Sequence, residues 1–382
     1  MTKVLTWRAL GRATLARQLL LERAPMGVAE AVEHLVGLQG QAPHAPYIGL
    51  WSRLSTFDPE ELSGLLRDRL VVRIALMRGT VHLVTARDAC GLRPLTQSIY
   101  DREVQANNLP AAPLAGLDLA ALAAAGRELL EAKPLSGTKL GALLCERWPN
   151  REAASLVYGL RGLLPLVQVP PRGLWGRSGQ PVLTTLQSWT GAPLSPMDPA
   201  VAVTRYLGAF GPASIQDVQA WSGLTGLGEV VRALPLARFR NEAGRDLFDL
   251  PDAPRPDPDT PAPVRFLADF DNLLVSHAVR TRVIADAHRT YMSRHRLVRA
   301  FLVDGVAAGT WTIAKGRLTV EPFGQLTKRD RAAVVAEGAA AGIRRAGRRS
   351  VRRDGRRSGV RVVVRQRSGA PLSAGSLPCS RS

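Results

Sequence analysis

The feature that most constrains the fold of this chain is a recurring pattern of short amphipathic segments followed by two strand-like segments joined by a Gly-rich or basic turn. Such recurrence indicates that one supersecondary unit is repeated along the chain. Helices followed by a two-stranded hairpin form the winged-helix plan. The sequence therefore predicts an α+β protein built from tandem winged-helix units, with ordinary mixed α/β domains as the alternative.

The first unit is expected within residues 1–100. Apolar periodicity predicts helices over 28–39, 47–54 and 59–69. Asp58 followed by Pro59 is typical of a helix start, because Asp caps free backbone N–H groups and Pro fits the first turn. Strands over 70–77 and 80–85 should then form a hairpin around Arg78 and Gly79.

Two further units follow the same plan. For residues 112–192 we expect helices over 120–132, 137–147 and 151–160, and a wing whose turns are 170–173 and 176–179. For residues 197–252 we expect helices over 200–210, 215–222 and 227–234, and a wing over 238–250.

The rest of the chain differs in composition. The Pro-rich stretch 249–263 is predicted to be a linker. Residues 264–343 are predicted to form a β-rich region with strands over 264–274 and 300–320, a basic interruption at 280–299 and a helix over 330–343.

The net charge of +19 is distributed unevenly. Residues 344–382 hold twelve Arg and one Asp, and their Arg, Gly, Ser and Pro content predicts disorder. This segment is either a basic arm that follows DNA phosphates or the product of a shifted reading frame. The second interpretation is favoured, because the pattern changes abruptly inside a helix.

Several classes of protein and site are excluded by the remaining patterns. No apolar run approaches the ~20 residues of a membrane span, so we expect no membrane contact and a cytoplasmic, nucleoid-associated protein. Cys90, Cys145 and Cys379 lie far apart in the sequence, so we expect no structural disulfide and no zinc site. No phosphate-binding loop, GxSxG or HExxH motif is present, and we expect no cofactor and no metal.

Four stretches, at 37–54, 71–84, 266–283 and 301–323, resemble in order and spacing the AlkZ-like family of winged-helix DNA glycosylases. The resemblance covers residues 5–343. It implies a C-shaped arrangement of winged-helix units around double-stranded DNA and excision of alkylated purines, in some members from interstrand cross-links. We expect a monomer.

The catalytic signature of that family, a glutamine, a small or aliphatic residue and a second glutamine, falls here on Gln39, Gly40 and Gln41. Residues i and i+2 project about 200° apart on a helix, so the two amides can share a site only if the helix ends before them. Pro43 is consistent with such an end. The alternative is a pair of surface glutamines at a helix C-terminus.

Amides can replace the usual carboxylates if the base is already cationic. A base alkylated on a ring nitrogen, such as N7-alkylguanine, leaves without a proton donor, so the enzyme needs only to place a water and stabilise the developing sugar cation. The resemblance therefore implies a monofunctional glycosylase restricted to cationic lesions. The alternatives are a non-enzymatic winged-helix DNA-binding regulator and a binding module for another partner.

Three sets of residues are candidates for DNA contact. Arg78, Thr80 and His82 alternate along a predicted strand, so they share a face; that face either contacts DNA or is solvated, with His82 hydrogen-bonded or acting as an acid or base. The second set is Arg172, Trp175 and Arg177 of the second wing, which either contacts phosphates or packs Trp175 beneath it. The third set is His277, Arg280 and Arg282, in a stretch that matches the family and in which Asp271 and Asn272 are expected to fix a turn.

Overall fold

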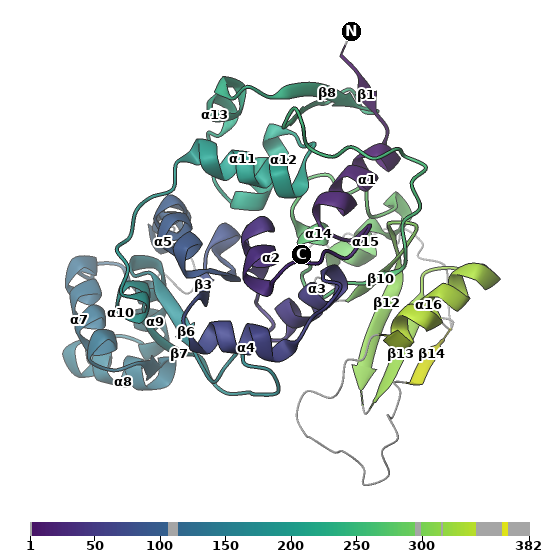
Figure 1. Ribbon diagram of the computed structural model, residues 1–382. Coiled ribbons are helices and arrows are strands. Elements are labelled where there is room, and N and C mark those ends of the chain that lie inside the picture. Colours follow the sequence, from purple (N-terminus) through teal and green to yellow (C-terminus); the bar gives the residue numbers. More distant parts are fainter. Residues whose placement is uncertain (1, 106–113, 295–298, 315, 341–360, 366–382) are drawn as a thin grey trace, which may run out of the picture.

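The computed structural model describes residues 2–105, 114–294, 299–314, 316–340 and 361–365. Helices and sheets alternate along the chain, so the predicted α+β class is confirmed. Figure 1 shows the helices α2 (Val28–His34), α3 (Ala45–Arg53) and α4 (Pro59–Arg67) in the middle of the molecule, with α7 (Leu119–Ala132) and α8 (Gly137–Arg147) on one side. On the other side lie the strands β10 (Arg265–Phe266), β12 (Val306–Ala314), β13 (Arg317–Pro322) and β14 (Arg361–Val364).

The first hundred residues contain the predicted order of helices and hairpin. The helix expected over 28–39 is shorter and ends at His34, after which Leu38 and Gln39 are extended. Asp58 caps its helix as expected, since its side chain accepts from the backbone N–H of Glu60. The first, fifth and sixth helices were not predicted. The elements are β1 (Val4–Leu5), α1 (Trp7–Arg17), α2 (Val28–His34), β2 (Leu38–Gln39), α3 (Ala45–Arg53), α4 (Pro59–Arg67), β3 (Val71–Ala75), the 3-10 turn η1 (Met77–Gly79), β4 (Val81–Thr85), α5 (Ala86–Leu95) and α6 (Gln97–Gln105).

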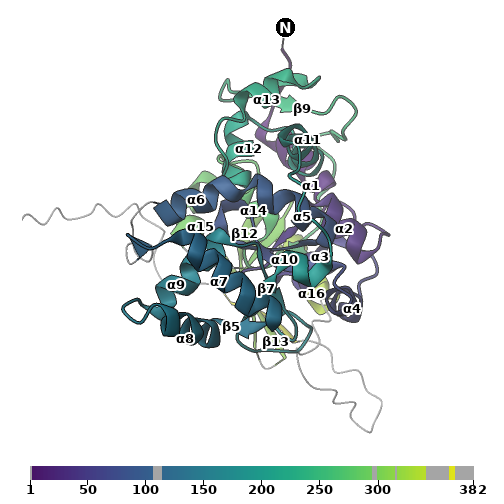
Figure 2. The same ribbon diagram turned by 90° about the vertical axis from the view of Figure 1, so that its left-hand side faces the viewer.

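The second stretch confirms its three predicted helices and both wing strands. The elements are α7 (Leu119–Ala132), β5 (Leu135–Ser136), α8 (Gly137–Arg147), α9 (Ala153–Leu163), β6 (Leu166–Val169), β7 (Val182–Thr185) and α10 (Leu186–Thr190). The three helices pack around a leucine-rich core, and they lie together at one end of the molecule in Figure 2.

The hairpins of the first two stretches form one sheet rather than two separate wings. Strand β3 pairs antiparallel with β6, so Arg73 lies beside Gln168 and Ile74 beside Val167. The resulting six-stranded sheet has the order β2-β4-β3-β6-β7-β5. Strand β2 is an edge of this sheet, which places the Gln39 segment at its margin.

The third stretch also contains its predicted helices and wing. They are α11 (Pro199–Phe210), α12 (Ile215–Ser222), α13 (Gly228–Ala233), β8 (Ala237–Asn241) and β9 (Asp246–Asp249). Ser214 and Asp217 form a reciprocal capping box at the start of α12. The N-terminal β1 pairs parallel with β8, which ties the start of the chain to this wing.

Beyond Asp249, the last residue of β9, the Pro-rich stretch 249–263 contains neither helix nor strand, and it is held along α1. Arg8, Arg12 and Arg17 of α1 donate to the backbone carbonyls of Pro258, Thr260 and Pro254, respectively. Arg17 also forms a buried ion pair with Asp249, at 2.6 Å. The predicted linker therefore has little regular secondary structure, and three arginines fix it in place along α1.

The C-terminal region is a five-stranded sheet, ordered β10-β11-β12-β13-β14, with helices packed against it. The prediction of a strand over 264–274 is mostly wrong, because only Arg265 and Phe266 are extended before a short helix begins at Asn272. A helix also occupies part of the basic interruption. The elements are β10 (Arg265–Phe266), α14 (Asn272–Val275), α15 (Asp286–Arg294), β11 (Ala300–Val303), β12 (Val306–Ala314), β13 (Arg317–Pro322), α16 (Lys328–Ala340) and β14 (Arg361–Val364).

Strand β14 corrects part of the expectation for residues 344–382. Residues 361–364 pair parallel with β13, and the side chains of Val362 and Val364 pack against the core of this sheet. Disorder is therefore wrong for this strand. Residues 344–360 and 366–382, and with them most of the arginine-rich segment, lie outside the described residues.

Among the described residues, no helix combines the length and the apolar character needed to cross a bilayer. Cys90 and Cys145 are both free thiols, and Cys379 lies outside the described residues.

Candidate active site and DNA interface

The chain is extended at Leu38 and Gln39, which form β2, and Gln41 lies two residues beyond the end of this strand, in a bend. Gln39 lies opposite His82 across the antiparallel pair β2–β4, and the N–H of Gly40 donates to the carbonyl of Val81 at 2.7 Å. Both glutamine side chains bond to the β3–β4 hairpin, Gln39 through Arg78 and Gln41 through the backbone of Val81. The helix before them ends five residues earlier, at His34.

The two glutamines differ in exposure and partners. Gln39 is only 7% exposed, and its Oε1 accepts from Nη2 of Arg78 at 2.9 Å. Gln41 is exposed, and its Oε1 accepts from the N–H of Val81 at 3.3 Å. A carbonyl oxygen has two lone pairs, so each amide oxygen can accept a second hydrogen bond.

A residue from the C-terminal region fixes the backbone next to Gln39. Oδ1 of Asn272 accepts from the N–H of Gln39 at 3.3 Å, and its Nδ2 donates to the carbonyl of Gly37 at 2.7 Å. The neighbouring Asp271 caps α14, as expected of a turn residue, and forms a buried bidentate pair with Arg53 of α3 at 2.7 and 2.9 Å. The site is thus assembled from parts of the chain more than 200 residues apart.

The turn between β3 and β4 does not present its polar residues freely to solvent. Arg78, at a left-handed φ of 57°, donates to Gln39 and to the carbonyl of Trp221, and burial lowers its pKa to about 10. Thr80 donates from Oγ1 to the carbonyl of Met77 at 3.1 Å. These contacts hold the half-buried side chain of Arg78 beside a glutamine.

His82 is buried, which corrects its prediction as a DNA contact. It is 2% exposed, and its Nδ1–H donates to the carbonyl of Thr80 at 2.9 Å. Burial, reinforced by the charge of Arg78, lowers the pKa of His82 to about 3. The imidazole is therefore neutral and weakly basic near pH 7, which also disfavours a role as acid or base.

The second wing combines an exposed arginine with a packed tryptophan. Arg177 is exposed, whereas Arg172 is half-buried and donates to the carbonyl of Gly179 at 2.5 Å. The ring of Trp175 lies 5.0 Å from that of Tyr47 and 6.3 Å from that of His44. Trp175 thus packs beneath the wing, which was the alternative to DNA contact.

Two of the three C-terminal candidates are core residues, so their prediction as backbone contacts is wrong. His277 is buried and hydrogen-bonds through Nε2 to the carbonyl of Phe210 at 3.1 Å. Arg282 is buried and donates to Oγ1 of Thr14 and to the carbonyl of Pro212. Neither side chain can reach a phosphate in this arrangement. Arg280 is half-buried.

Comparison with known proteins identifies the family of this chain. The model of a family described as "DNA glycosylase AlkZ-like" matches residues 32–342, which includes both glutamines, the β3–β4 hairpin and Asn272. The chain belongs to the AlkZ-like DNA glycosylase family. It is accordingly a DNA glycosylase, an enzyme that binds DNA and hydrolyses N-glycosyl bonds in DNA repair.

Relatives of this AlkZ-like glycosylase are found among curated proteins and solved structures. The "Interstrand DNA cross-link repair glycosylase" of Streptomyces sahachiroi is 23% identical over 377 residues, which cover 89% of this chain and 98% of the relative. The solved structure of Streptomyces sahachiroi DNA glycosylase AlkZ superposes with a TM-score of 0.77 at 22% identity, covering 95% of this chain and all of that one. The second comparison supports the fold.

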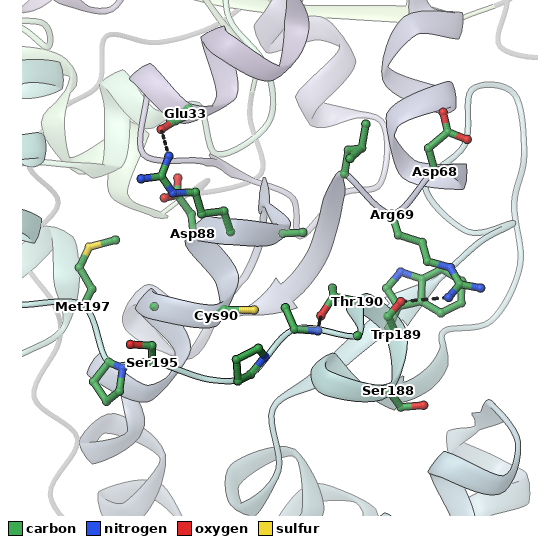
Figure 3. Close-up of a pocket in the computed structure, with 18 of the residues that line it drawn as sticks. Glu33, Asp68, Arg69, Asp88, Cys90, Ser188, Trp189, Thr190, Ser195 and Met197 are labelled. Carbon is green, nitrogen blue, oxygen red and sulfur yellow. Dashed lines mark hydrogen bonds and ion pairs between the residues drawn. The ribbon is translucent and has the colours of Figure 1, made fainter.

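The AlkZ-like chain also has a pocket of about 930 Å³ that lies apart from the glutamines. Figure 3 shows it between Glu33 of α2, Cys90 of α5 and Trp189 of α10. It adjoins the start of β3 and the end of β4, at Leu70 and Ala86, away from the turn that connects the two strands. Its lining contains none of the predicted site residues, so it does not extend the glutamine site.

In the described part of this AlkZ-like chain, no group of three or more His, Cys, Asp or Glu side chains is arranged to hold a metal ion.

Proposed function

We propose that this chain hydrolyses the N-glycosidic bond of cationic alkylated purines of the N7-alkylguanine type in double-stranded DNA, with Gln39 and Gln41 as the catalytic residues. The observation that carries the proposal is that the amides of Gln39 and Gln41 both bond to the β3–β4 hairpin at the edge of the large sheet, the first to Arg78 and the second to the N–H of Val81. Each amide oxygen has an acceptor position left for a water molecule.

The chemistry then requires little proton transfer. The bond between C1′ and N9 breaks, its electron pair neutralises the positive charge of the alkylated base, and the sugar becomes oxocarbenium-like. A water held by the two amide oxygens adds its oxygen to C1′ and releases a proton to solvent. Oriented amide dipoles stabilise the developing cation without a carboxylate.

The tandem winged-helix, C-shaped arrangement is proposed as the frame that holds the duplex. The exposed Arg177 in the wing after β6 is suited to phosphate contact, which positions DNA without selecting a base. Arg280 is retained as a further candidate for the same role. The name of the Streptomyces relative suggests interstrand cross-links as substrates for this chain as well. Membership of a glycosylase family does not favour the regulator, which would bind DNA without excision.

The test replaces both Gln39 and Gln41 by Ala and measures excision of N7-methylguanine from a duplex under single-turnover conditions. We expect DNA affinity to persist and the excision rate to fall at least ~10²-fold, the scale of losing a preorganised polar contact to the transition state. Single variants should be nearly as slow as the double variant if one water needs both amides. Gln187→Ala, in α10, is the matched control.

A folded double variant that excises at the wild-type rate would rule out the glutamines as the catalytic pair. Loss of DNA binding in parallel with loss of excision would instead show that they serve affinity.

A further inference from the structure

Arg73 is a buried arginine directly beneath the glutamine segment. It occupies the middle of β3, opposite Leu83 of β4 and Gln168 of β6. Leu83 in turn lies opposite Leu38, so Arg73 faces the side of the sheet from which Gln39 points away. The side chain is 1% exposed.

Among the described residues, this guanidinium has no anionic partner. The titratable groups that act on it are Arg172, which lowers its pKa, and the hydroxyl of Tyr47, and no carboxylate of the described residues is among them. Burial lowers the pKa of Arg73 to about 10, so the group remains charged at neutral pH. Its Nε has no hydrogen-bond partner within the described structure. An uncompensated buried charge is costly to stability, and a buried apolar side chain of similar size would avoid that cost.

The hydrogen bonds of Arg73 are directed at the backbone between the two glutamines. Its Nη2 donates to the carbonyl of Gly40 at 2.8 Å and approaches Oε1 of Gln168 at 3.4 Å. The N–H of Gly40 is held from the other side by the carbonyl of Val81. Both peptide groups that flank Gly40 are therefore fixed, one by β4 and one by Arg73.

Two glycines make room for this side chain. A Cβ at Gly40 would lie 3.1 Å from Nη1 of Arg73, and a Cβ at Gly173 would lie 2.6 Å from its Cδ. Gly173 belongs to the wing after β6, so Arg73 is enclosed between the glutamine segment and that wing. The small residue between the glutamines thus has a structural consequence: a Cβ at position 40 would require the guanidinium, which bonds to the Gly40 carbonyl, to shift by a few tenths of an ångström.

We infer that Arg73 is a positioning residue for excision, which holds the Gly40 peptide so that Gln39 and Gln41 share one water. The inference rests on the proposed function of the two glutamines. A rotation of the peptide between residues 40 and 41 would move one amide relative to the other, and a displacement near 1 Å in such a site costs about 10²-fold in rate. The buried arginine lowers stability, and we infer that it is retained because function requires it.

The test compares Arg73→Met with Arg93→Met as a matched control. Arg93 is also buried, and it donates to a glycine carbonyl, that of Gly162, and to a glutamine Oε1, that of Gln97, away from the candidate site. For Arg73→Met we expect the single-turnover excision rate to fall about 10²-fold, with unchanged DNA affinity and a melting temperature that does not fall. Arg73→Lys, which retains one donor, should recover part of the rate, and Arg93→Met should excise at the wild-type rate.

A double-mutant cycle tests the contact itself. Gly40→Ala alone should slow excision, because its Cβ displaces the guanidinium, whereas in the Arg73→Met background the same change should have little further effect. Hydrogen exchange of the peptide covering residues 38–41 should accelerate in Arg73→Met and remain unchanged in Arg93→Met.

The outcomes separate this inference from the proposed function. If Gln39→Ala with Gln41→Ala abolishes excision while Arg73→Met excises normally, the inference is wrong and the glutamine assignment stands. If the glutamine double variant excises normally, the proposed function fails and the positioning role fails with it. Loss of melting temperature with unchanged exchange at residues 38–41 would make Arg73 a purely structural residue.

Discussion

Arg78 donates from Nη2 to Oε1 of Gln39 at 2.9 Å, so the guanidinium orients the amide of a glutamine that lies almost entirely below the surface. A second nitrogen of Arg78 donates to the carbonyl of Trp221, which anchors the side chain to the end of α12. The residue therefore links α12 to the candidate catalytic segment.

This relationship predicts that Arg78→Met lowers the excision rate more than the DNA affinity. A hydrogen bond to a charged donor contributes about 1.5–3 kcal/mol, so we expect the rate to fall by roughly 10- to 100-fold when the Gln39 amide is free to rotate. Single-turnover kinetics and titration of undamaged duplex measure the two effects. Arg102→Met is a suitable control, because Arg102 also donates to a backbone carbonyl near this turn, that of Gly223. Equal losses of DNA affinity and excision rate would instead indicate that Arg78 contacts DNA.

Because two histidines are buried with lowered pKa values, we expect the free energy of unfolding to fall in mild acid. His82 has a folded-state pKa of about 3, below its ordinary value of 6.5, so between these values the unfolded chain binds a proton that the folded chain does not. Unfolding free energy should therefore decrease as pH falls below about 6.5 and be constant in this respect above it. The pKa of His277 is depressed by burial as well, and it contributes in the same direction.

Urea unfolding at pH 7 and pH 5 tests this expectation. His82→Gln should reduce the difference in unfolding free energy between the two pH values by up to about 2 kcal/mol, which corresponds to 1.36 kcal/mol per pKa unit. An unchanged difference would mean that His82 takes up a proton in the folded state.

The exposed arginine of the second wing is expected to contribute affinity without selectivity. Arg177→Ala should weaken binding to damaged and undamaged duplex by similar factors and reduce the salt dependence of binding by about one phosphate contact. Arg172→Ala should weaken both similarly, here through loss of its bond to the Gly179 carbonyl as well. Fluorescence anisotropy over a range of salt concentrations provides the measurement. A change in lesion preference from either variant would contradict a backbone role.

The end of the chain should be needed for stability only as far as β14. A chain ending at Gly342 loses this strand and the packing of Val362 and Val364, so its melting temperature should fall, by about 2–4 °C for each kcal/mol lost. A chain ending at Arg365 keeps the strand and should melt like the full chain. Equal melting temperatures for the two truncations would show that β14 adds nothing to stability.

Local sequence patterns determined most of the secondary structure and one essential property of the site. Helices with clear caps, such as α4 after Asp58 and α12 after Ser214, were predictable because their signals lie within one turn of the helix end. The spacing of Gln39 and Gln41 required extended backbone for the same local reason, since side-chain direction depends only on neighbouring dihedral angles.

Only the tertiary structure decided which polar side chains meet and which are buried. Pairing of β3 with β6 joined two predicted wings into one sheet and enclosed Arg73, while Asn272 reached Gln39 across 233 positions of sequence. His277 and Arg282 resembled surface cations in sequence but lie in the core. An arginine or histidine carries no local signal of its burial, because burial depends on contacts between segments that are distant along the chain.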